Sequence, residues 1–262
     1  MLLAFAYLIG TNVLVLSAYG GARFLHRRYA DDELKDLSLS LIFRISALHS
    51  LILALVFAQE MITYRSVSLA ERDEATAVAS LYYDIGRYGA DDATTETVRT
   101  DLTAYIADAV CTEWSSLSDG QGLVLDAWMD RERLLGTILD LEPSTTRQRY
   151  VLDGMLRDLE IIEQSRNARG AVSSVGVTAI FWIPAILGLA IVSILYSAYS
   201  AKPIHIILLS FYATFNGIVL LMIHAFGNPY AAPGQVTPSH FEALVAKDTA
   251  LSASPDLACI RR

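Results

Sequence analysis

The feature that most constrains this chain is an uninterrupted stretch from Leu37 to Asp84. It contains no Gly or Pro, and it begins as an apolar segment of membrane-spanning length before it becomes charged. A single helix over this stretch would be about 70 Å long, whereas the hydrocarbon core of a bilayer is about 30 Å thick. The sequence therefore predicts a helix that crosses the membrane and continues outside it.

One face of this helix combines apolar and ionisable residues. At about 100° per residue, its members fall within roughly 40° of one line. They are His49, Leu53, Val56, Glu60, Val67, Glu71, Glu74 and Val78. Glu60 is the most informative of them, because it lies near the membrane edge, where a charge is costly unless it meets water or a partner.

Two interpretations of this face are open. It could line a water-filled path, with acidic rings at Glu60 and at Glu71 or Glu74. In the other interpretation Glu60 reaches water at the interface, Val67 and Val78 pack on a neighbouring helix, and Glu71 and Glu74 flank that contact. The valines favour the packed interpretation, and the carboxylates favour the water-filled path.

Composition places the chain in the membrane class. Of its 262 residues 53% are hydrophobic, and the mean hydropathy is +0.40. The net charge of −8 and the lack of a basic stretch argue against nucleic acid as a partner. Cys111 and Cys259 are far apart and lack metal-ligand spacing, so we expect no zinc site or disulfide framework. They could be two ordinary thiols, and the sequence leaves open whether they pair.

We predict an all-α fold with four transmembrane helices arranged as two hairpins. The expected spans are 2–18, 41–64, 171–199 and 204–226. Arg23, Arg27 and Arg28 follow the first apolar run, whereas a cleavable signal peptide carries its positive charge before that run, so we expect the first span to be retained. In the later spans, Pro184 predicts a kink, and Gly176 and Gly188 allow close helix approach.

A helical extramembrane domain is expected between spans two and three, in residues 65–170. Segments with helical periodicity lie at 94–110, 123–141 and 149–162, separated by turn-forming sequences. This domain carries essentially all of the net negative charge, which either attracts cations to a vestibule or simply keeps the surface soluble. We therefore divide the chain into spans one and two (1–64), the acidic domain (65–170), spans three and four (171–226) and a C-terminal tail (227–262). In that tail a short amphipathic segment is expected at 239–245, and the last dozen residues are expected to be loose.

Four spans place the domain and both termini on the same side of the cell membrane. Basic residues flank the spans at both ends. Arg23, Arg27, Arg28, Lys35, Arg44 and Lys202 lie at one end, and Arg65, Arg72, Arg157, Arg166 and Arg169 lie at the other. The positive-inside rule does not choose between two nearly equal sets.

Two local patterns, together with this order of spans, resemble the bestrophin-like family of bacterial membrane proteins. Glu74-Ala75-Thr76-Ala77 is similar to the family's Glu-Ala-Asn-Ala, with Thr76 in place of Asn. The stretch 228–244 is similar to Pro-Phe-x-Gly followed by Val-x-Pro, with Tyr230 in place of Phe and a wider gap before Gly234. The resemblance implies an oligomeric ion channel of the inner membrane, with the second span lining the pore and the domain in the cytoplasm. Ile52 and Val56 would then be the nearest equivalents of the neck.

Two functions follow as hypotheses. In the first, a homo-oligomer conducts inorganic ions past second-span residues that include His49, Ile52, Leu53, Val56 and Glu60, and its acidic rings favour cations. In the second, a non-conducting scaffold or accessory subunit docks a protein partner through the acidic domain. No catalytic motif is present in the sequence, so we expect no enzyme activity, cofactor or metal.

Overall fold

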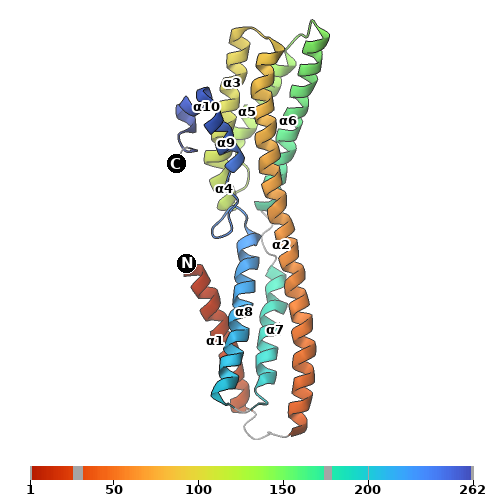
Figure 1. Cartoon of the computed structure of the whole chain (residues 1–262), viewed down its shortest axis with the longest axis vertical. Helices are drawn as coiled ribbons and strands as arrows, with labels where there is room; N and C mark the ends of the chain where they lie inside the picture. Colours follow the sequence, from red (N-terminus) through yellow and green to blue (C-terminus); the bar gives the residue numbers. More distant parts are fainter. Residues whose placement is uncertain (1, 26–31, 174–178, 200, 261–262) are drawn as a thin grey trace. The chain divides into compact units, whose positions relative to one another are not determined.

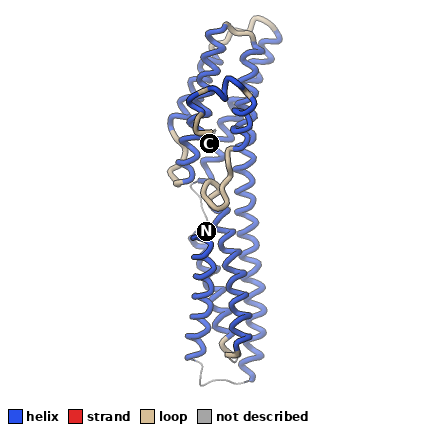
Figure 2. Tube along the Cα trace, turned by 60° about the vertical axis from the view of Figure 1, so that its left-hand side comes forward, coloured by secondary structure: helices blue, strands red, loops and turns tan. Residues whose placement is uncertain are grey.

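The computed structural model describes residues 2–25, 32–173, 179–199 and 201–260, and the regular structure in these ranges is helical (Figure 2). Four helices are long and apolar enough to cross a membrane, as the sequence predicted. They are α1 (Leu2–Leu25), α2 (Asp32–Tyr88), α7 (Ala179–Tyr196) and α8 (Pro203–Gly227). The chain is therefore an all-α membrane protein.

The long second helix is confirmed as one continuous element. α2 runs from Asp32 to Tyr88 without a break at Tyr64, where its apolar part gives way to its charged part (Figure 1). It ends before Gly89, which has a φ of 77°. That left-handed conformation costs glycine little, so Gly89 allows the chain to turn at the end of the helix.

The chain divides into two compact units. The membrane unit consists of 1–62 and 177–227, and the helical unit consists of 63–176 and 228–262. The C-terminal residues, which we expected to form a tail, thus group with the helical unit.

Small residues bring α1 and α8 together in the membrane unit. A Cβ at Gly217 of α8 would collide with the hydroxyl of Thr11 on α1, so the backbones approach closely at this point. One turn away from it, the Asn12 amide donates a hydrogen bond of 3.0 Å to the Thr214 hydroxyl. α1 therefore packs on α8 through small and polar side chains, and α7 continues through Pro184 beside them.

The helical unit is a bundle built on the second half of α2. Its other elements are α3 (Asp92–Ala107), a π-helix η1 (Asp108–Glu113), α4 (Trp114–Ser118), α5 (Leu125–Leu139), α6 (Thr146–Ser173), α9 (Ser239–Lys247), α10 (Thr249–Ala253) and a 3₁₀ turn η2 (Pro255–Leu257). In Figure 1, α3, α5 and α6 lie alongside α2. Apolar side chains from α2, α3, α5, α6, α9, α10 and η2 form one core.

Polar caps start two of these helices where the sequence predicted turns. The Asp91 carboxylate accepts a hydrogen bond of 2.8 Å from the Thr94 amide and thereby caps α3. The Thr145 hydroxyl accepts from the Gln148 amide at 3.1 Å, and the Gln148 side chain accepts from Thr145 in return. Both caps satisfy amide groups that the first helical turn leaves unpaired.

The sequence misplaced one boundary, and it did not predict the burial of the C-terminal segment. α6 continues to Ser173, so the first residues of the expected third span belong to the helical unit. Gly176 lies outside the described residues. In the C-terminal segment, Leu251 and Leu257 are buried in the core of the helical unit, although we expected the last dozen residues to be loose.

Candidate functional site

In the membrane unit, the first part of the α2 face turns toward α7. His49 is buried, and its Nε2 lies 3.0 Å from the Ala185 carbonyl oxygen. The ring occupies the space that a side chain at Gly188 would need. Leu53 is also buried, in a cluster with residues of α1, α7 and α8. Both residues therefore pack within the subunit, and the structure does not place them on an open path.

The other predicted pore residues in the membrane-length part of α2 are more accessible. Ile52 is 37% exposed, and Val56 and Glu60 are half-buried. Among the described residues, no basic side chain forms an ion pair with Glu60. Three of the five predicted membrane positions thus remain available to a neighbour or to water.

An apolar hollow of about 450 Å³ lies between α2 and α8. Its walls include Leu53, Phe57, Phe215 and Val219, and Asn216 is one of its few polar residues. The Asn216 amide donates to the Tyr212 carbonyl oxygen at 2.9 Å, within its own helix. This hollow within one subunit is therefore largely apolar.

In the helical unit, Glu74 meets a buried arginine. Arg169 of α6 donates from Nε to Glu74 Oε2 at 2.6 Å and from Nη2 to Oε1 at 2.9 Å. Neither side chain has exposed surface. A bidentate pair of this kind is strong, and it fixes both side chains in one orientation. Glu74 therefore joins α2 to α6.

A second carboxylate extends this cluster. Glu113, the last residue of the π-helix, accepts from Arg169 Nη2 at 3.0 Å and from Arg166 Nη2 at 2.6 Å. It also accepts from the Val124 amide at 3.1 Å. Two carboxylates thus balance two guanidinium groups inside the bundle, as buried charges require. We call Glu74, Glu113, Arg166 and Arg169 the buried ion cluster.

Aromatic residues surround the buried ion cluster. The Tyr105 hydroxyl donates to Glu74 at 2.6 Å, and Arg169 lies over the Trp114 ring at 5.2 Å. Burial lowers the pKa of Arg169, but the carboxylates of Glu74 and Glu113 outweigh this effect and hold that pKa above its usual value. Burial, and then the Glu74 charge, raise the pKa of Tyr105 well above its usual value. Arg169 therefore stays charged and Tyr105 stays neutral.

Glu71 binds the start of α9. Its Oε1 accepts from the His240 amide at 2.8 Å, and its Oε2 lies 2.5 Å from His240 Nδ1. Glu71 is 1% exposed, and a carboxylate is favoured at the N-terminus of a helix. Glu71 therefore anchors the C-terminal segment to α2.

These contacts differ from the arrangement expected for an ion path in this part of α2. Val67, Glu71, Glu74 and Val78 all lie in the interior of the helical unit. The packed interpretation describes them in this structure, although the partners of Glu71 and Glu74 were not foreseen. A signal was available, because α6 carries Met155, Leu159 and Ile162 on one face, and Arg166 and Arg169 continue that face.

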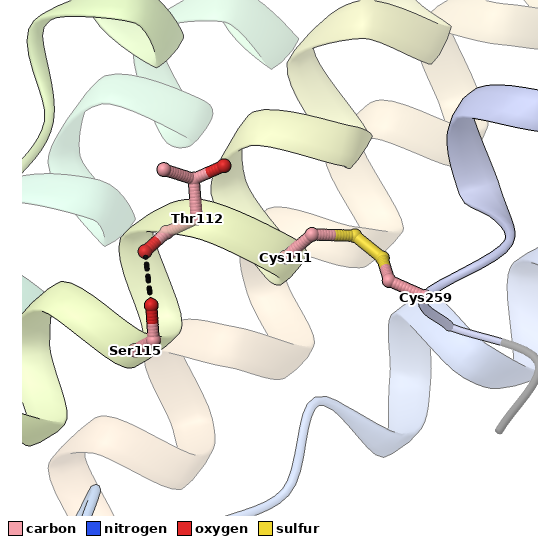
Figure 3. Close-up of a disulfide and its surroundings, with 4 residues drawn as sticks. All are labelled: Cys111, Thr112, Ser115 and Cys259. Atoms are coloured by element: carbon pink, nitrogen blue, oxygen red, sulfur yellow. Dashed lines mark hydrogen bonds between the residues drawn. A yellow bond between two sulfur atoms is a disulfide. The ribbon is translucent and has the colours of Figure 1, made fainter.

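The structure answers a question that the sequence left open, whether the two cysteines pair. Cys111 of the π-helix and Cys259 form a disulfide across 148 residues of sequence, with their Cα atoms 6.0 Å apart (Figure 3). This pairing could not be predicted from the sequence, because the bond depends on the docking of a segment that we expected to be loose.

Comparison with known proteins finds one family that matches most of the chain. A family model described as a Bestrophin-like domain matches residues 4–241. No curated protein matches the chain. The two stretches that resemble family patterns meet at Arg169, whose side chain binds Glu74 and whose carbonyl oxygen accepts from the Tyr230 hydroxyl at 2.9 Å.

Proposed function

This chain belongs to the bestrophin-like family, and we propose that it forms a homo-oligomeric ion channel in the cell membrane. In this proposal α1 and α2 form one membrane hairpin, α7 and α8 form the other, and the helical unit is inserted between them. One α2 from each subunit surrounds a central path for inorganic ions. No chemical conversion is part of this function.

The observation that carries the proposal is the environment of the Glu60 side chain. It lies in the membrane-length part of α2, it is partly accessible, and no basic side chain of the described residues pairs with it. A carboxylate in such a position is costly unless water or another subunit meets it. A water-filled path between subunits would supply that environment, whereas the hollow within one subunit is apolar.

The accessible residues of α2 in the membrane unit support a restricted set of pore residues. We propose Ile52 and Val56 as a hydrophobic constriction and Glu60 as an acidic ring that favours cations. His49, Leu53 and Val67 are buried in the subunit, and Glu71 and Glu74 are engaged by His240 and Arg169, so the proposal does not use them.

Bilayer recordings of the purified protein test this function. With asymmetric potassium chloride across the bilayer, we expect currents whose reversal potential indicates cation preference. Glu60→Gln should move the reversal potential toward zero, because it removes the charge of the ring. Glu132→Gln changes a partly exposed carboxylate of α5, in the helical unit, and serves as the matched control. Absence of conductance, or the same selectivity in wild type and Glu60→Gln, would reject the proposal.

The burial of Glu71 and Glu74 favours a second candidate function. Because these carboxylates hold the helical unit together, that unit could act as a non-conducting scaffold whose exposed acidic surface docks a protein partner. Imaging of purified particles separates the two candidates. Convergence of the α2 helices on a symmetry axis supports the channel, whereas α2 helices that face lipid support the scaffold.

A further inference from the structure

The disulfide fastens the C-terminal segment to the helical bundle. Cys111 and Cys259 are the two cysteines of the sequence, and their Cα separation of 6.0 Å lies within the usual range for a disulfide. Figure 3 shows the bond between the π-helix and the end of the chain. The segment before Cys259 is also held by packing, since Leu251 and Leu257 are buried in the core.

Packing therefore brings the two sulfur atoms together, and the bond needs only an electron acceptor. Cys259 is exposed and Cys111 is half-buried, so a disulfide-donating protein can reach the pair. In thiol–disulfide exchange, the two thiols lose two electrons and two protons and form the Cys111–Cys259 bond. The donor's disulfide takes up both and becomes two thiols. Such bonds persist in oxidising compartments and are rare in the cytosol.

We propose that the helical unit faces the oxidising, extracytoplasmic side of the membrane, where Cys111–Cys259 forms as a permanent structural disulfide. The family resemblance implied a cytoplasmic domain, so this inference reverses that expectation. It does not depend on whether the chain conducts ions.

The distribution of arginines supports the same side. Arg166 and Arg169 belong to the basic residues at the helical-unit end of the spans. Both are buried partners of Glu113 and Glu74. Packing explains their presence without reference to topology. The remaining bases at this end are Arg65, Arg72 and Arg157, against Arg23, Arg27, Arg28, Lys35, Arg44 and Lys202 at the other. The excess at the second end favours its placement in the cytoplasm.

The redox state of Cys111 and Cys259 is tested first, on the full-length protein in the membranes of a bacterial host. Cells are quenched with acid to trap thiols, and the denatured protein is treated with a maleimide polymer that retards each labelled chain on a gel. We expect no labelled thiol before reduction and two after it. Two free thiols in quenched cells would overturn the proposal.

Sidedness is tested with a membrane-impermeant maleimide on intact spheroplasts. In a Cys111→Ser/Cys259→Ser background, Ser115→Cys reports on the helical unit and Lys202→Cys reports on the turn before α8; both native side chains are exposed. We expect labelling of Ser115→Cys in intact spheroplasts and of Lys202→Cys only after lysis. The reverse pattern would overturn the proposal.

The wild-type chain provides a second measurement if the serine background fails to fold. An impermeant phosphine reduces the disulfide only from the side that it can reach, and the impermeant maleimide then labels the new thiols. Labelling of two thiols in intact spheroplasts supports the proposal. Labelling that requires lysis contradicts it.

Discussion

Glu74 of α2 and Arg169 of α6 form a bidentate ion pair, and both side chains are 0% exposed. Glu74 belongs to the Glu-Ala-Thr-Ala stretch that resembles the family pattern. In this protein the acidic residue of that stretch has a packing role, because it neutralises a buried guanidinium group. The same arginine receives the Tyr230 hydroxyl on its carbonyl oxygen, so one residue connects two distant motifs.

Removal of the Glu74 charge should destabilise the helical unit. Glu74→Gln removes the charge of a carboxylate that pairs with the buried Arg169. Loss of one member of a buried ion pair typically costs about 3–5 kcal/mol. We expect a clear fall in the Tm of the detergent-purified protein, measured by thermal unfolding.

Arg87→Gln is the matched control for this change. Arg87 pairs with Asp84 on the same helix, but its side chain is 64% exposed, and exposed pairs contribute about 0–1 kcal/mol. Its Tm should stay close to that of the wild type. Equal Tm values for Glu74→Gln and the wild type would show that the buried pair does not stabilise the unit.

Asp130 should give the helical unit an unusual pH response. Burial and the neighbouring Asp108 carboxyl raise the pKa of Asp130 to about 6, although Arg133 opposes this effect. The folded state then binds this proton more tightly than the unfolded state does. The Asp130 contribution to stability is therefore complete below the unfolded pKa of about 4 and is lost as the pH rises through 6.

Thermal unfolding between pH 4 and 7 measures this contribution. Asp130→Asn removes the titrating group, so the difference in Tm between variant and wild type should shift in favour of the variant as the pH rises. For Asp91→Asn the Tm difference should shift in the opposite direction, in favour of the wild type as the pH rises, because hydrogen bonds from Thr94 lower the pKa of Asp91. A Tm difference for Asp130→Asn that is independent of pH would contradict the prediction.

Sequence patterns predicted the features that depend on a single segment of the chain. The absence of Gly and Pro from 37 to 84 predicted the continuous α2, and the apolar runs predicted the four spans. The partners of Glu71 and Glu74 could not be predicted in the same way, since His240 and Arg169 come from remote segments. Charges that interrupt an apolar stripe on two helices are a signal for pairing, but periodicity alone does not say which helices meet.

Gly188 should be essential to the packing of α2 on α7. A Cβ at this position would overlap the His49 ring, and overpacking of this kind typically costs about 1–3 kcal/mol. Gly188→Ala should therefore lower the Tm of the protein or its yield as a monodisperse particle. Gly10→Ala on α1 has no atom near the added Cβ, and helix propensity favours alanine there, so it should not be destabilising. Equal behaviour of the two variants would show that α2 does not depend on this contact.

The C-terminal segment should be a structural part of the helical unit even without its disulfide. Leu257 is 0% exposed in the core, and a buried Leu→Ala change typically costs about 2–5 kcal/mol. In a Cys111→Ser/Cys259→Ser background, Leu257→Ala should therefore release the segment and make it sensitive to limited proteolysis, as mass spectrometry of the intact chain would show. Leu139→Ala removes the same atoms from a side chain that is 61% exposed, so it should leave the segment protected. If the serine background alone already exposes the segment to protease, the disulfide holds it in place and the packing of Leu257 does not.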